Sequence, residues 1–149
     1  MLKKIKSLLL EKPSDSTPPK RSLELAAAAL LVEAAIMDGN FDATEHDVIA
    51  NLLSNRFSLN EGEVDELISE AKTEIESSVE LYGFARTIKD SMEHDERVEI
   101  MEMLWRVVLA DGVVDDYESN LIRRVAGLIY VSDRDSGLAR QRAIADGQT

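Results

Sequence analysis

Two acidic turns with the same pattern are the part of this chain best suited to chemistry. The pattern Asp-Gly-x-x-Asp-x-x-Glu occurs once near residue 40 and again 73 positions later. Its six carboxylates are the candidate metal ligands, namely Asp38, Asp42 and Glu45 in the first copy and Asp111, Asp115 and Glu118 in the second. An all-oxygen ligand set of this kind suits Ca²⁺, Mg²⁺ or Mn²⁺ and does not suit Zn²⁺.

Helix capping explains part of the pattern without any ligand. The glycine of each copy ends one helix, and Asp42 or Asp115 then caps the next helix, with the glutamate completing a capping box. Capping does not explain Asp38 and Asp111, which fall in the last turn of a helix, where the helix dipole disfavours a carboxylate. Three hypotheses therefore stay open: a bound divalent cation, pure capping and turn geometry, and a surface that docks a partner.

Helices must position these turns, and the sequence predicts an all-α fold. Each turn follows an apolar helix, over residues 25–37 and 98–109, and precedes an amphipathic one. The pattern predicts a compact bundle of about seven helices, built from two helix-turn-helix repeats around two central apolar helices. The expected helices begin near residues 22, 42, 60, 79, 94, 115 and 132, with Ser22, Asn60 and Ser132 as further caps. Expected core residues are Leu30, Ile36, Met101, Met103, Leu104, Trp105 and Val108.

Two charged residues interrupt the central helices at equivalent positions. Glu33 and Arg106 are also 73 positions apart, and each is surrounded by apolar neighbours in sequence. An isolated charge in such a place is costly. We therefore expect these residues either to pair with each other across a pseudo-twofold axis or to find separate partners nearby.

The charge of the chain is unevenly distributed. The net charge of the 149-residue protein is −12, yet residues 1–21 contain six Lys and Arg against two acids. We expect a basic amphipathic arm over residues 1–12, a Pro-rich linker over residues 13–21 and one helical domain over residues 22–149. The arm either packs on the body or makes peripheral contact with an anionic membrane through its Lys, Leu and Ile side chains.

The doubled motif resembles the tellurite-resistance TerB-like family. The second copy matches best, with the helix end at residues 104–110 followed by Asp111, Gly112, Asp115 and Glu118. The first copy follows the same pattern but has Met37 where alanine is expected. The resemblance covers roughly residues 22–146. It implies a helical cytoplasmic domain with an acidic, metal-binding surface, linked to metal stress and to membrane-associated assemblies.

Other chemistry finds little support in the sequence. There is no cysteine, and neither His46 nor His94 follows a glutamate at the spacing that a di-iron bundle needs. The acidic charge argues against a nucleic-acid partner. We therefore expect a non-enzymatic, cytoplasmic binding module with a divalent cation as its only cofactor and an unidentified protein partner. The alternatives are a ligand-free interaction scaffold and a metal-assisted hydrolase.

Overall fold

The computed structural model describes residues 20–36, 41–77, 81–110 and 114–147. Seven α-helices make up these residues, and no strand occurs among them. They are α2 (Lys20–Ile36), α3 (Ala43–Phe57), α4 (Glu61–Glu76), α5 (Leu81–Ser91), α6 (His94–Leu109), α7 (Asp116–Leu128) and α8 (Asp133–Gly147). The all-α class and the expected number of helices are confirmed. The basic arm and most of the linker lie outside the described residues.

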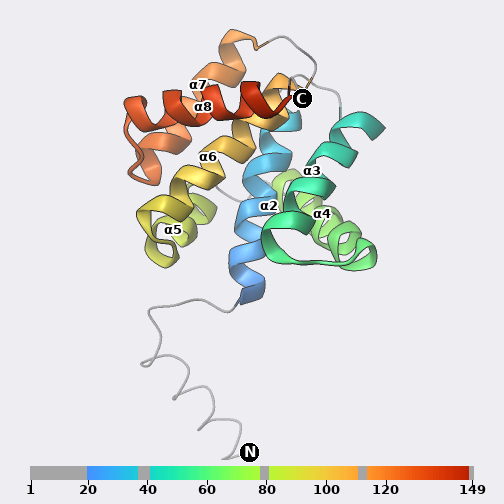
Figure 1. Cartoon of the computed structure of the whole chain (residues 1–149). Helices are drawn as coiled ribbons and strands as arrows, with labels where there is room; N and C mark the ends of the chain where they lie inside the picture. The colour runs from blue at the N-terminus through green and yellow to red at the C-terminus, as the bar shows by residue number, and fades with distance from the viewer. Residues whose placement is uncertain (1–19, 37–40, 78–80, 111–113, 148–149) are drawn as a thin grey trace, which may run out of the picture.

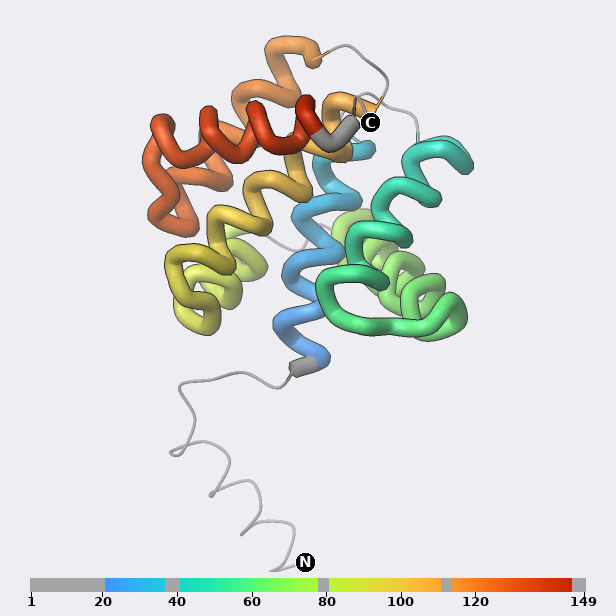
Figure 2. Tube along the Cα trace, viewed as in Figure 1, coloured from blue at the N-terminus to red at the C-terminus, as the bar shows by residue number. Residues whose placement is uncertain are grey.

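Helix α2 runs through the middle of the molecule. Figures 1 and 2 show α3 and α4 on one side of it and α5 to α8 on the other. Nine of its residues between Ala26 and Ala35 are at most 1% exposed, and only Glu33 in this stretch is half-buried. A helix that is apolar on nearly all sides must be covered on nearly all sides, and α2 contacts five other helices.

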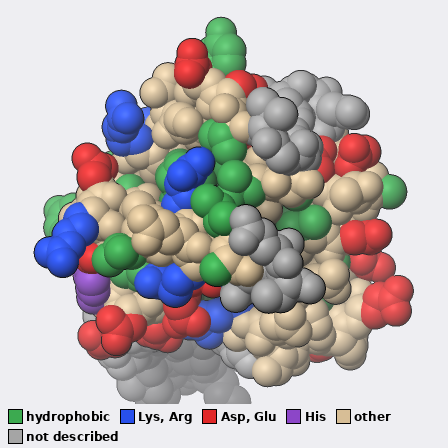
Figure 3. Space-filling view, turned by 45° about the horizontal axis from the view of Figure 1, so that its top comes forward, with side chains coloured by type: hydrophobic (Ala, Val, Ile, Leu, Met, Phe, Trp, Pro, Cys, Tyr) green, Lys and Arg blue, Asp and Glu red, His purple; other side chains and the backbone are tan. Residues whose placement is uncertain are grey.

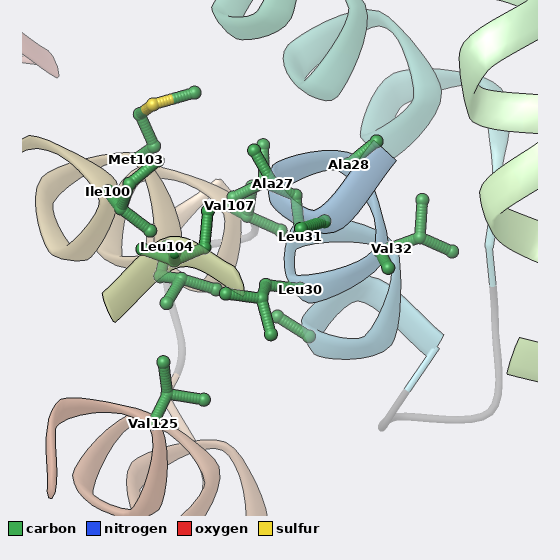
Figure 4. Close-up of a cluster of buried hydrophobic side chains, with 14 of the residues drawn as sticks. Ala27, Ala28, Leu30, Leu31, Val32, Ile100, Met103, Leu104, Val107 and Val125 are labelled. Atoms are coloured by element: carbon green, nitrogen blue, oxygen red, sulfur yellow. The ribbon is translucent and has the colours of Figure 1, made fainter. Parts of the chain in front are cut away.

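Helix α6 is the second central element. It packs against α2, α3, α7 and α8. In Figure 4 the side chains of Leu30 and Leu104 point toward one another between α2 and α6, and Val125 of α7 lies below them. Leu30, Leu104 and Val108 are buried as expected, whereas Ile36 is only half-buried because α2 ends there.

The repeat is larger than the expected helix-turn-helix unit. Helix α4 packs along α2, and α8 packs along α6 in the equivalent way; these are the two most extensive helix pairs described. Each copy is therefore a unit of three helices, and α5 connects the two units while contacting α2 and α7. The sequence did not show that α4 and α8 are equivalent members of the repeat. Helix α4 buries large residues such as Leu67 and Ile68, whereas α8 buries Ser136 and Ala139.

Two sequence expectations were wrong in detail, namely the start of the first helix and the place of Trp105 in the core. Helix α2 begins at Lys20 and not at a Ser22 cap, and the guanidinium of Arg21 pairs with Glu70 of α4 at 2.7 Å, which holds this first turn against the body. Trp105 is half-buried at the edge of the core, where its Nε1 donates to Ser136 Oγ at 3.1 Å. On α8, Leu138 is 42% exposed, because this helix turns its small residues toward α6.

The charged residues of the central helices do not pair with each other among the described contacts. Arg106 Nη2 donates to Glu102 Oε2 at 2.8 Å, one turn earlier on α6. Glu102 also accepts from Arg142 Nε of α8 at 2.9 Å, so one carboxylate joins two helices. The expectation of a separate partner is confirmed for Arg106. Glu33 stays half-buried on α2.

Candidate metal corners

The first corner is a complete capping box at the start of α3. Asp42 has extended backbone geometry, and its Oδ1 accepts from the backbone N–H of Glu45 at 2.9 Å. In return Glu45 Oε1 accepts from the backbone N–H of Asp42 at 3.3 Å. The two side chains thus fix one another and satisfy two of the helix donors that have no partner within the helix.

The second corner repeats this geometry at the start of α7. Asp115 Oδ1 accepts from the backbone N–H of Glu118 at 2.8 Å, and Glu118 Oε1 accepts from that of Asp115 at 3.2 Å. The surroundings differ, because Glu118 is only 4% exposed whereas Glu45 is half-buried. The capping half of the sequence prediction is therefore confirmed at both copies.

Both corners lie at the same end of the molecule. Helices α3 and α7 begin near the top of Figure 1, where α2 and α6 end. Figure 3 brings this end forward and shows acidic side chains at several places around the edge of the face, most of all on the right, with basic side chains on the left and near the middle. The acidic side chains carry charge of the sign that would attract a cation.

The remaining members of the predicted metal set, Asp38 and Asp111, lie outside the described residues. Within the described ranges, no group of three or more His, Cys, Asp or Glu side chains is arranged to hold a metal ion. Each capping bond occupies one oxygen of its carboxylate. A cation site at either corner therefore depends on the second oxygens together with Asp38 or Asp111, and the predicted site stays a prediction.

The side chains of the two histidines contact aspartates of neighbouring helices. His46 Nε2 is 3.5 Å from Asp65 Oδ1, between α3 and α4. His94, at the start of α6 as expected, has Nε2 at 3.2 Å from Asp135 Oδ2 of α8. Sequence reasoning missed these aspartates, because they come from the third helix of each repeat.

A groove lies between α3 and α6. It has a volume of about 490 Å³, and its lining includes Arg56, Glu99, Glu102 and Arg106. Arg56 Nη2 is 3.1 Å from Glu96 Oε2, and Arg106 is held by Glu102. The charged groups that line this groove balance one another, so it has no strong preference for an ion of either sign.

Comparison with known protein families shows to which family the chain is related. A family model described as tellurite resistance protein TerB matches residues 24–141. The chain belongs to the TerB family. The TerB match begins within α2 and ends within α8, so it covers most of both three-helix units and contains both corners. Neither the curated proteins nor the solved structures gave a match. Of the TerB helices that the structure describes, none has the length and apolar character needed to cross a bilayer.

Proposed function

We propose that this TerB protein is a non-enzymatic binding module whose two acidic corners take up a hard divalent cation, Ca²⁺, Mg²⁺ or Mn²⁺. The observation that carries the proposal is the doubled capping box. It holds an aspartate and a glutamate at fixed positions in both copies. In each copy a further aspartate, Asp38 or Asp111, stands four residues before the capping aspartate in a position that capping does not require.

The same geometry sets the strength of binding. The N-terminus of a helix carries partial positive charge and opposes a cation, and one oxygen of each carboxylate is already bonded to backbone. The capping aspartate and glutamate offset this in part, Asp38 or Asp111 would add a third carboxylate, and water would complete the coordination sphere, as hard cations readily accept. We therefore expect weak binding, saturating at millimolar cation concentrations.

Thermal melting with and without added cation tests this proposal. A cation that binds only the folded protein raises its stability by roughly 2.7 kcal/mol at a hundredfold excess over the dissociation constant. The double variant Asp38→Asn, Asp111→Asn should lose this gain and, without metal, should melt no lower than the parent, because a charge leaves each helix C-terminus.

Cap variants provide the control. Asp42→Ala or Asp115→Ala should destabilise the metal-free protein by about 1 kcal/mol through lost capping. A melting temperature that is insensitive to millimolar Ca²⁺, Mg²⁺ and Mn²⁺ would rule out the cation and leave a ligand-free scaffold. Hydrolysis of p-nitrophenyl phosphate with Mn²⁺ would instead favour the metal-assisted hydrolase.

A role in the response to tellurite or metal stress is proposed from family membership alone. It predicts that cells lacking this protein grow less well on tellurite than cells complemented with it. Complementation by the Asp38→Asn, Asp111→Asn variant would show that the role does not depend on the corners.

A further inference from the structure

Two exposed tyrosines meet at one hollow on the far side of α2 from α3 and α4. Tyr82 of α5 is 55% exposed, and Tyr130, just after α7, is 69% exposed. Together with Arg86, Lys89 and Gly127 they line a hollow of about 200 Å³ between α5 and the end of α7. Isolated exposed aromatics are ordinary, whereas two that flank one hollow call for an explanation.

The backbone at Tyr130 is in a conformation that disfavours tyrosine. Its φ is 59°, in the left-handed region, where the chain leaves α7. Val131 N–H donates to Ala126 O at 2.8 Å and Tyr130 N–H to Gly127 O at 3.4 Å, the bonds of a Schellman motif. Glycine is the usual residue here, and a bulky side chain is strained. The ring gains little burial in return, so packing in the core does not explain its presence.

The tyrosine is also held in place before any partner arrives. Arg97 Nη1 of α6 donates to Ile129 O at 2.9 Å and so fixes the chain just before Tyr130. Lys89 Nζ of α5 lies 4.9 Å from the centre of the Tyr130 ring, in cation–π contact. A preorganised aromatic surface loses little conformational entropy on binding.

Positive charge surrounds this hollow in an otherwise acidic chain. Arg86 and Lys89 line it, and the exposed Arg123 and Arg124 lie on α7 one turn before Gly127, which also lines it. Asp90 approaches Arg86 Nε at 3.7 Å and Lys89 Nζ at 3.4 Å, which offsets only part of that charge. Because the Debye length is about 8 Å at physiological ionic strength, a ligand here senses these cations more than the distant carboxylates.

We propose that this hollow, the Tyr82–Tyr130 pocket, docks an acidic peptide segment of a partner protein through an aromatic anchor. The volume suits a single side chain, which packs between the two rings, while flanking carboxylates pair with Arg86 and Arg124. Tyrosine and arginine are the residues most often found at the energetic centre of such interfaces. A membrane surface fits less well, since the chain carries a net charge of −12.

The direct test is an NMR titration of the ¹⁵N-labelled full chain with a capped heptapeptide whose central phenylalanine is flanked by glutamates. The largest amide shifts should fall on Tyr82, Lys89, Gly127 and Tyr130. Replacing the glutamates by glutamines, or the phenylalanine by alanine, should weaken binding at least ~10-fold, the usual effect of losing an anchor. Shifts centred elsewhere, or equal binding of the glutamine peptide, would overturn the proposal.

Two variants separate docking from folding. A Cβ at Gly127 would meet no atom within 4 Å, so Gly127→Met should fill the hollow without disturbing α7 and weaken peptide binding at least ~10-fold. Tyr130→Gly removes the ring and relieves the strained backbone, so it should lose binding while its melting temperature stays level or rises.

Gly62→Met is the matched control, because Gly62 lies on α4 across the molecule and a Cβ there makes only ordinary contact, 3.5 Å from Asn60 Oδ1. It should bind the peptide like the parent. If Gly127→Met binds as tightly as Gly62→Met, the site is wrong. The full chain could instead bind no peptide and be retained on phosphatidylserine vesicles. If Gly127→Met abolished that retention, the ligand of the pocket would be a membrane and not a peptide.

Discussion

Equivalent glutamates of the two corners have acquired different surroundings. Glu45 and Glu118 make the same capping bond, yet Glu118 is 4% exposed and Glu45 is half-buried. A buried carboxylate has lost most of its hydration and depends on its hydrogen bonds far more than an accessible one. The second corner is therefore the more tightly integrated into the core.

We predict that Glu118→Ala destabilises the protein more than Glu45→Ala does. The first change disrupts a buried hydrogen-bonded network and should cost about 1–3 kcal/mol. The second removes a capping partner from a more accessible site and should cost at most about 1 kcal/mol. Urea unfolding of both variants measures the difference. Equal losses would show that the burial of Glu118 is energetically neutral.

For single residues, the sequence predicted contacts between residues that are close in the chain and missed contacts between separate helices. The capping pairs Asp42–Glu45 and Asp115–Glu118 follow from a spacing of three residues and were confirmed. The prediction that Trp105 lies in the core was wrong, because its position at the edge depends on Ser136 of α8, 31 residues away. The αL conformation of Tyr130 carries no sequence signal, since glycine would be the expected residue.

Among the elements, α8 shows how a weakly apolar helix can pack closely. Its buried residues are Ser136, Ala139 and Ala143, spaced by three and four positions along one side. Small side chains allow α8 to lie near α6, where Trp105 and Glu102 reach it. A periodicity argument that weighs only large apolar residues, such as Leu138, does not find the buried side of this helix.

This packing predicts opposite outcomes for two adjacent positions. Ala139 is fully buried, so Ala139→Leu should force α8 away from α6 and cost about 1–3 kcal/mol by overpacking. Leu138 is 42% exposed, and Leu138→Ala should change stability by no more than about 0.5 kcal/mol. Thermal melts of the two variants, compared with the parent, test which side faces the core. A larger loss for Leu138→Ala would reverse the assignment.

In the whole molecule, the acidic corners and the Tyr82–Tyr130 pocket lie in different places relative to the repeat. The two three-helix units meet along α2 and α6, which brings both acidic corners to one end. The Tyr82–Tyr130 pocket involves α5, which belongs to neither unit. The repeat was visible in the sequence because the Asp, Gly, Asp and Glu residues of the two acidic turns recur at the same spacing. The pocket was not, because α5 and the end of α7 are brought together only by the fold.

The basic arm leads to a prediction about the whole chain. The family match begins at residue 24, and the first turn of α2 is held by Arg21 and Glu70, both about half-exposed. Because these contacts need no residue before Lys20, deleting residues 1–19 should leave the melting temperature nearly unchanged. The deletion leaves the Arg21–Glu70 pair intact, and an exposed pair of this kind contributes at most about 1 kcal/mol.

Membrane contact by the arm makes a separate, salt-dependent prediction. The full chain should be retained on phosphatidylserine vesicles at low salt and released at high salt, because attraction between exposed charges is screened. The deleted chain should not be retained at either salt concentration, whereas Gly127→Met should behave as the full chain does. A marked drop in melting temperature on deletion would mean that the arm packs on the body. Failure of the full chain to bind at low salt would exclude the membrane role.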